Sequence, residues 1–226
     1  MEKKKIICIA VVALIIVIIL GIIVYGISRN NSDTKTTSEE DNNNLTNNEI
    51  KNEKENENMY LSGKYNAEIV VKNYGTIKLE LDADTAPITV TNFVKLAKSG
   101  FYDGLTFHRI ISGFMIQGGD PLGNGMGGSD ENIKGEFAQN GIKNPISHVR
   151  GTISMARAYS RDSASSQFFI MHEDNTFLDG QYAGFGHVTS GIEIVDKICE
   201  DTKVEDDNGT VLKQNQPVIE TIRILD

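Results

Sequence analysis

Residues 6 to 27 restrict what this chain can fold into more than any other feature, because none of these 22 residues carries a charge. As an α-helix they would be roughly 33 Å long, enough to cross a hydrocarbon core of about 30 Å. Lys3, Lys4 and Lys5 precede the run and only Arg29 follows closely. The positive-inside rule then predicts a single-pass anchor in the cell membrane, with a cytoplasmic N-terminus and the rest of the chain extracytoplasmic.

A cleaved signal peptide is the alternative interpretation of this run. Its apolar core would be shorter, roughly 7 to 15 residues, and would end in a small-residue cleavage site. No Ala-x-Ala pattern follows residue 27, and the cysteine that a lipoprotein needs after the run is instead at its start, as Cys8. A buried core helix would rarely be so uniformly apolar. We therefore expect an uncleaved anchor.

Composition divides the remainder into a linker and one domain. Residues 28 to 58 contain ten asparagines, eight acidic and four basic residues, and almost no large apolar side chains. Such a segment buries too little apolar surface to offset the entropy of ordering, so we expect a disordered tether. The predicted organisation is residues 1–5 as a cytoplasmic N-terminus, 6–27 as the anchor, 28–58 as the linker and 59–226 as one domain of ordinary size.

Charge and cysteine content narrow the possible partners. The chain carries −9, of which residues 1–5 contribute +2 and the linker −4, so −7 remains for residues 59–226. This acidity argues against nucleic acid as a partner, since binding a phosphate backbone needs clustered lysine and arginine. The domain has only one cysteine, Cys199, so its stability rests on packing without an internal disulfide.

Short apolar runs with period-two alternation predict a mainly β domain. Between residues 75 and 81, for example, Ile77, Leu79 and Leu81 would share one face of a strand. Two stretches have helical spacing instead, one beginning near Pro87 and one near Ile192. The pattern predicts a closed antiparallel barrel capped by two α-helices. The predicted strands are 67–72, 75–81, 106–117 with a turn at 112–113, 151–156, 166–171, 182–188 and 218–225.

The stretch Phe107-His108-Arg109-Ile110-Ile111, followed by residues 114–120, carries the clearest chemical signal. It places one arginine beside large apolar side chains and one amide side chain, Gln117. Because successive side chains of a β-strand point to opposite faces, Arg109 and its neighbour His108 would lie on opposite faces of the strand. The alternatives to a functional site are that Arg109 forms a surface ion pair and that the apolar residues belong to the ordinary hydrophobic core. The pattern favours a reaction that needs a fixed hydrogen-bond donor and no proton transfer.

Other candidate motifs are weak. Residues 123–128 are rich in glycine, but their spacing is wrong for a dinucleotide loop and no helix follows. The domain's histidines lack metal-ligand spacing, and no Gly-x-Ser-x-Gly elbow accompanies the serines of 160–166. We therefore expect no metal, no cofactor and no hydrolase activity.

Several spaced motifs resemble the cyclophilin peptidyl-prolyl isomerases. They are residues 107–120, Gly151-Thr152-Ile153-Ser154-Met155-Ala156-Arg157-Ala158, Ser165-Ser166-Gln167-Phe168-Phe169-Ile170, Phe177-Leu178-Asp179-Gly180 and Phe185-Gly186-His187-Val188. The resemblance covers about residues 65 to 226 and keeps the order of the motifs. It implies an eight-stranded antiparallel barrel with a helix at each end and a groove on its outer face.

The resemblance also implies roles for individual residues. Arg109 matches the catalytic arginine of the family. The pocket for the proline ring matches Phe114, Met115, Phe169 and Leu178, and the polar lining of the groove matches Gln117 and Gln167. The segment that pairs with the substrate backbone matches Ala156, Arg157 and Ala158.

Three positions depart from the best-known eukaryotic pattern. Phe177 replaces a common tryptophan and lacks its indole N–H, which would weaken binding of cyclosporin-type ligands. Tyr182 replaces a common histidine and keeps an aromatic wall with a polar tip, so we expect proline binding to survive. Arg157 replaces a common asparagine, which matters little if that contact is made by the backbone.

The sequence therefore predicts a membrane-tethered, monomeric peptidyl-prolyl cis-trans isomerase that acts on proline-containing peptides and unfolded exported proteins. Two other functions stay open. The same groove could hold proline peptides without turnover, as a binding module, or the domain could be a general chaperone that protects proline-free clients equally well.

Overall fold

The computed structural model describes residues 59–226. The predicted cytoplasmic N-terminus, anchor and linker, residues 1–5, 6–27 and 28–58, lie outside the described residues. Within 59–226, no helix combines the length and the apolar character needed to cross a bilayer.

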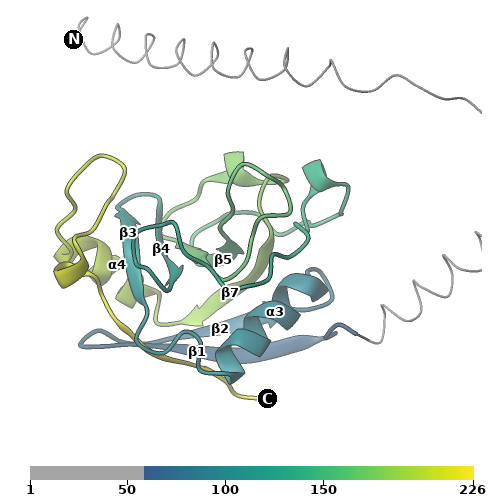
Figure 1. The fold of residues 1–226 in the computed structure, drawn as a ribbon, viewed down its shortest axis with the longest axis horizontal. Coiled ribbons are helices and arrows are strands. Elements are labelled where there is room, and N and C mark those ends of the chain that lie inside the picture. The colour runs from purple at the N-terminus through teal and green to yellow at the C-terminus, as the bar shows by residue number, and fades with distance from the viewer. Residues whose placement is uncertain (1–58) are drawn as a thin grey trace, which may run out of the picture. The chain divides into compact units, whose positions relative to one another are not determined.

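Eight strands form one antiparallel sheet with the order β3-β4-β6-β5-β7-β2-β1-β8 (Figure 1). This confirms the predicted mainly β class and most of the expected strands. The strands are β1 (Lys64–Val71), β2 (Gly75–Asp82), β3 (Thr106–Ile111), β4 (Met115–Asp120), β5 (Thr152–Met155), β6 (Phe168–Met171), β7 (Gly184–Ser190) and β8 (Ile219–Ile224).

The two predicted α-helices are present and pack against this sheet. Helix α3 (Pro87–Lys98) begins at its proline and contacts β8 and β2, and α4 (Ile192–Asp201) contacts β2. The first turn of α3 has no capping side chain of its own; Glu136 instead accepts the main-chain N–H groups of Ile88 and Thr89 at 3.0 and 2.7 Å. Three short 3-10 turns complete the elements: η1 (Ala138–Asn140), η2 (Thr176–Leu178) and η3 (Lys213–Asn215).

The predicted closed barrel is wrong, because β3 and β8 remain the two edges of the sheet. Among the described residues the one bridge at this place joins Thr106 to Val218, the residue before β8, and main-chain hydrogen bonds from Phe107 to Pro217 and from Ile219 to Leu105 flank it. Most of the outer edge of β3 is taken instead by residues 209–211, which exchange main-chain hydrogen bonds with His108 and Ile110. The sheet is therefore a half-barrel, and the segment that blocks its closure lies directly beside Arg109.

Strand β6 separates two apolar clusters, because successive side chains of a strand point to opposite faces. Phe168 and Ile170 are fully buried in the main core, where Phe168 packs edge-on against the ring of Phe93 from α3. Phe169 and Met171 point the other way and belong to a second, smaller cluster. That second cluster forms the floor of the candidate site.

Candidate active site

The second apolar cluster brings together the residues predicted to form a proline pocket. Met115, Phe169, Met171 and Leu178 are buried at its centre, and Phe169 and Leu178 keep 5% and 6% of their surface exposed. Four partly buried side chains pack around them: Ile111, Phe114, Ala156 and Tyr182. An apolar floor with residual exposure suits a small apolar ring.

Aromatic side chains form two walls of this pocket. The ring of Tyr182 meets that of Phe169 edge-on, with centroids 5.8 Å apart. The ring of Phe177 stacks on that of Phe114 at 5.9 Å, and 63% of Phe177 is exposed. Two of the three positions that depart from the common family pattern, Phe177 and Tyr182, therefore contribute aromatic surface to the groove.

Arg109 and Gln117 face each other across paired strands, since the register of β3 and β4 places them opposite. The Nη1 group of Arg109 donates to Gln117 Oε1 at 3.3 Å and lies 4.0 Å from the Met115 sulfur. Gln117 Nε2 then donates to Gln167 Oε1 at 2.9 Å. A chain of amide groups thus connects the guanidinium to Gln117 and Gln167, the residues that the resemblance assigns to the polar lining of the groove.

Asn208 is a partner of Arg109 that the sequence did not predict. Arg109 Nε donates to the main-chain oxygen of Asn208 at 2.8 Å, and Nη2 donates to its Oδ1 at 3.2 Å. No carboxylate of the described residues lies within 4.0 Å of the guanidinium, so the alternative of a surface ion pair is wrong for this part of the chain. An Asn-Gly pair signals a turn, but no local signal identifies a contact across 99 residues.

The turn that presents Asn208 is held by Asp206. Its Oδ1 accepts the main-chain N–H of Thr210 at 3.0 Å, and its Oδ2 accepts the Thr210 hydroxyl at 2.9 Å. Partial burial lowers the pKa of Arg109, while the nearby Tyr182 and Asp206 oppose that shift. Because a guanidinium is not deprotonated in proteins near neutral pH, Arg109 stays charged there.

The segment Ala156–Ala158 borders the other side of the pocket. Ala156 N–H donates to Gln167 O at 2.9 Å and Ala158 N–H donates to Ser163 Oγ at 3.0 Å. Between them, neither the main-chain N–H nor the C=O of Arg157 has a hydrogen-bond partner among residues 59–226. The backbone of Arg157 is therefore free to pair with an extended peptide.

A buried polar chain behind Phe169 was also missed. The ring of His148 stacks against that of Phe169 with centroids 5.9 Å apart. Its Nδ1 is 2.8 Å from Asp179 Oδ1 and its Nε2 is 3.0 Å from Ser154 Oγ. Burial lowers the pKa of His148, although Asp179 opposes the shift. The neutral imidazole therefore supports the pocket floor from below.

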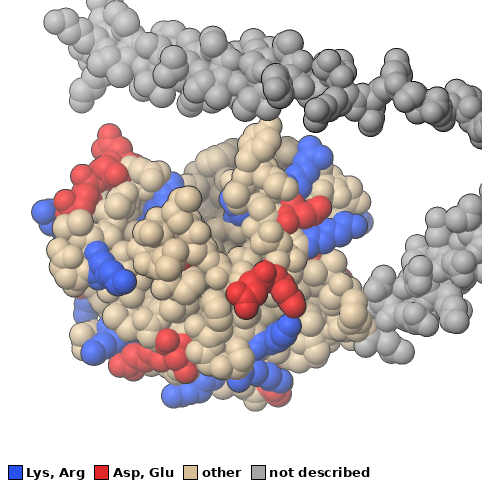
Figure 2. All heavy atoms as spheres, in the orientation of Figure 1, with Lys and Arg blue, Asp and Glu red and all other residues tan. Residues whose placement is uncertain are grey.

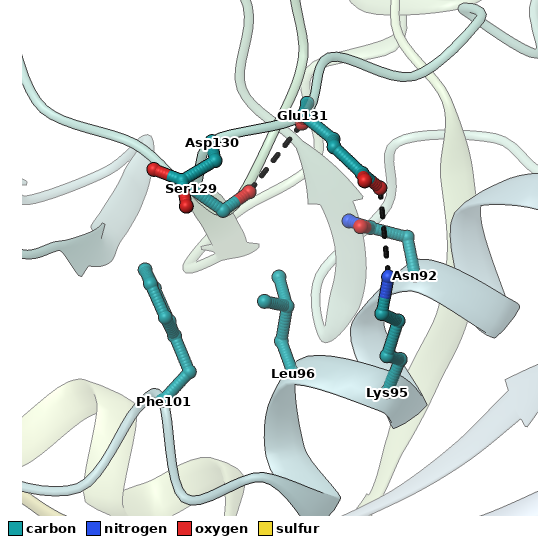
Figure 3. A pocket seen from close by; sticks show the side chains of 7 residues that line it. All are labelled: Asn92, Lys95, Leu96, Phe101, Ser129, Asp130 and Glu131. Carbon is teal, nitrogen blue, oxygen red and sulfur yellow. Dashed lines mark hydrogen bonds and ion pairs between the residues drawn. The ribbon is translucent and has the colours of Figure 1, made fainter.

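Two further views show the distribution of surface charge and a hollow apart from the groove. On the face drawn in Figure 2, acidic and basic side chains are interspersed, so the net charge forms no single-sign field there. Figure 3 shows a separate hollow of about 220 Å³ over the C-terminal half of α3, where Lys95 reaches Glu131 at 3.5 Å above Leu96 and Phe101. None of the predicted site residues lines that hollow.

Comparisons with known proteins agree with this geometry. A family model described as cyclophilin type peptidyl-prolyl cis-trans isomerase matches residues 66–226. A Helicobacter pylori peptidyl-prolyl cis-trans isomerase is 46% identical over 159 residues, which cover 70% of this chain and 90% of that protein. Peptidyl-prolyl cis-trans isomerase B of Bacillus subtilis is 47% identical over 138 residues, covering 61% of this chain and 87% of the relative.

A solved structure gives the same result for the fold. The crystal structure of a Cryptosporidium parvum cyclophilin type peptidyl-prolyl cis-trans isomerase, determined in the presence of the dipeptide Ala-Pro, superposes with a TM-score of 0.63 at 32% identity. The match covers 71% of this chain and 99% of that one. The chain belongs to the cyclophilin-type peptidyl-prolyl cis-trans isomerases.

Proposed function

We propose that Arg109 accelerates rotation about X–Pro bonds by donating a hydrogen bond to the prolyl nitrogen as the amide twists. The observation that carries this proposal is a guanidinium without an ionic partner in residues 59–226, fixed at the rim of an apolar pocket. The pocket around Phe169 and Leu178 holds the proline ring while the preceding carbonyl swings.

A donor at this position acts on the barrier itself. Amide resonance gives X–Pro rotation a barrier of about 18–20 kcal/mol, and that resonance is lost in the twisted state. The prolyl nitrogen then becomes pyramidal and gains a lone pair that the ground state lacks. A hydrogen bond to this lone pair exists only near the transition state, which is the condition for raising the rate of the chemical step.

The lowering of the rotational barrier can be divided between the hydrogen-bond donor and the pocket. A 10⁵-fold acceleration requires on the order of 7 kcal/mol. One preorganised donor in a partly dry site supplies about 3–4 kcal/mol. Binding of the ring and alignment of the peptide by the pocket would provide the rest.

The contacts of Arg109 support preorganisation. A guanidinium has five N–H donors. Three of these reach oxygen acceptors, two on Asn208 and one on Gln117, which leaves one N–H on each terminal nitrogen. The guanidinium is thus held in place and still has N–H groups free to donate to a substrate. The free backbone of Arg157 would align the peptide on the opposite side of the pocket.

For the biological setting we propose that residues 6–27 anchor the protein in the cell membrane and that the isomerase domain acts outside the cytoplasm on exported chains. The uncharged run and the lysines before it support this topology. Protease added to intact cells should remove the domain at the linker. Complete protection of the domain in intact cells, with cleavage after lysis, would contradict this topology.

Turnover can be tested by two-dimensional NMR exchange spectroscopy, which measures the rate of cis-trans exchange of a proline peptide with and without the full-length protein. Faster cis-trans exchange is expected. Binding without faster exchange would make the groove a holding module instead. Refolding of two clients, one limited by proline isomerisation and one free of proline, separates isomerase action from general chaperoning, since only the first should accelerate.

A further inference from the structure

Two arginines beside the groove lack acidic partners, although the domain itself is acidic. We propose that Arg157 and Arg161 give this isomerase a preference for prolyl bonds that have an acidic side chain within about three residues. This inference rests on the proposed function of the groove and names the substrates that the groove prefers.

Arg157 is held in place rather than freely solvated. Its guanidinium carbon lies 4.8 Å from the centroid of the Tyr182 ring and 5.1 Å from that of Phe137. Its Nε donates to Gln181 O at 3.0 Å, and its Nη1 donates to the main-chain oxygens of Ala158 at 3.0 Å and of Tyr159 at 3.2 Å. No acceptor for Nη2 lies among the described residues, so this end of the fixed cation remains free to bind.

Two other arginines of the domain are paired with acids. Arg150 lies 2.7 Å from Asp196, and Arg223 lies 2.9 Å from Glu68. In residues 59–226, by contrast, no carboxylate approaches Arg157 or Arg161 within 4.0 Å.

Two acids close in sequence to these arginines or to their contacts already accept other hydrogen bonds. Asp162, next to Arg161, accepts hydrogen bonds from Gly135 N–H and Asn140 Nδ2 at 2.9 and 2.7 Å. Asp179 accepts from Ser147 and His148. Arg157 is therefore a positive charge that the fold holds in place, and neither arginine has a carboxylate within ion-pair distance among the described residues.

Both arginines line one open hollow of about 800 Å³ that has no acidic residue in its wall. The hollow adjoins the proline pocket, because Tyr182 belongs to the wall of both. Tyr159, also in its wall, is 92% exposed and offers a ring to a bound chain. The remaining lining residues are neutral: Gln139, Ala158, Ser160 and Gln181.

A peptide that places its proline on Phe169 and pairs with the backbone of Arg157 would extend across this hollow. An acidic side chain on that peptide would meet two cations, one of them rigid. Exposed ion pairs contribute little, whereas a pre-positioned guanidinium fork binds a carboxylate with less loss of side-chain freedom. We expect kcat/KM to favour acidic peptides by about fivefold to tenfold at low salt.

The test compares capped peptides that carry Glu, Gln or Lys at single positions up to three residues on either side of proline. NMR exchange with the full chain gives kcat/KM for each peptide, and the measured quantity is the Glu-to-Gln ratio. At one or more positions this ratio should reach at least fivefold in low salt and fall toward 1 at about 0.5 M salt. Lys at the same position should react more slowly than Gln.

Variants then test whether the preference for acidic peptides comes from Arg157 and Arg161. The double change Arg157→Gln with Arg161→Gln should bring the ratio close to 1, whereas Arg157→Lys should retain only part of the preference, because a flexible ammonium keeps the charge but lacks the anchored fork. Arg223→Gln, which removes a cation paired elsewhere, is the matched control and should leave the ratio unchanged. Using the ratio cancels any general loss of activity in a variant.

Two outcomes would overturn the inference: a Glu-to-Gln ratio near 1 at every position in the wild type, or a preference that survives in the double variant. Failure of the groove itself gives a different result, because the Gln peptides would then show no catalysed exchange at all. That outcome would overturn the proposed function and the inference with it.

Discussion

Replacing Gly209 by alanine should impair catalysis while leaving the buried floor of the pocket in place. Gly209 has φ of +79°, and an added Cβ would overlap the Ile110 main-chain oxygen and lie 2.6 Å from Ile111 Cγ1. The bond of 2.8 Å between Ile110 N–H and Gly209 O holds this turn on the edge of β3. The turn must therefore move away from the strand, and Asn208 moves with it.

The expected magnitude follows from the contacts of Arg109. Asn208 supplies two of the three oxygen acceptors of the guanidinium. Displacing a catalytic group by about 1 Å can cost on the order of 10²-fold in rate. Under the proposed mechanism we expect kcat to fall about 30- to 100-fold and KM to change less than about threefold, because the apolar floor is intact. The left-handed backbone of an alanine should also cost about 1–2 kcal/mol of stability.

NMR exchange kinetics and urea unfolding measure the two effects separately. Gly141 is the matched control: its φ is also +79° and an added Cβ would meet nothing within 4 Å. Gly141→Ala should lose similar stability but keep its kcat. Asn208→Ala, which removes only the Oδ1 acceptor, should give an intermediate loss of roughly threefold to tenfold. A folded Gly209→Ala protein with wild-type kcat would refute positioning by this turn.

Three further outcomes are expected. The rate kcat should be flat from pH 6.5 to 8.5, because Arg109 does not titrate there; a bell-shaped profile would contradict this. Burial lowers the pKa values of His108 and His148. Below about pH 6.5 these histidines are therefore protonated in the unfolded state before they are protonated in the folded state. Urea unfolding should show nearly constant stability between about pH 7 and pH 8. Toward pH 5 the stability should fall by at most about 1.4 kcal/mol per pH unit for each histidine. Rising stability toward pH 5 would exclude this effect. Leu178→Ala should raise KM severalfold and cost about 2–3 kcal/mol of stability, and an unchanged KM would remove Leu178 from the pocket.

Local pattern predicted most strands, because these depend on neighbours in sequence, and the resemblance to the cyclophilins predicted the pocket residues. The alternation of Ile77, Leu79 and Leu81 appears as three side chains with at most 1% of their surface exposed. Gln167 and Phe169 share parity and lie on the same face, where Gln167 binds Gln117. Arg109, Phe114 and Met115 come from one hairpin, so short-range geometry already brings them together.

Contacts between distant segments could not be predicted in this way. Closure of the sheet depends on which segment takes the free edge of β3, and residues 209–211 approach it from about 100 positions away. The same long-range pairing brings Asn208 to Arg109. His148, Asp179 and Ser154 likewise meet only through the packing of β5, η2 and the loop before β5, so their side chains appeared as scattered polar residues in the sequence.

The most direct test of the central proposal is the kcat of Arg109→Gln and Arg109→Lys, measured by NMR exchange beside peptide affinity. If the guanidinium stabilises the twisted amide, Arg109→Gln should lose about 10²- to 10³-fold in kcat and bind the ground-state peptide within about threefold of wild type. Arg109→Lys should recover only part of the rate, because a flexible ammonium lacks the anchored fork. Near wild-type kcat in Arg109→Gln, or a loss confined to peptide affinity, would contradict the account.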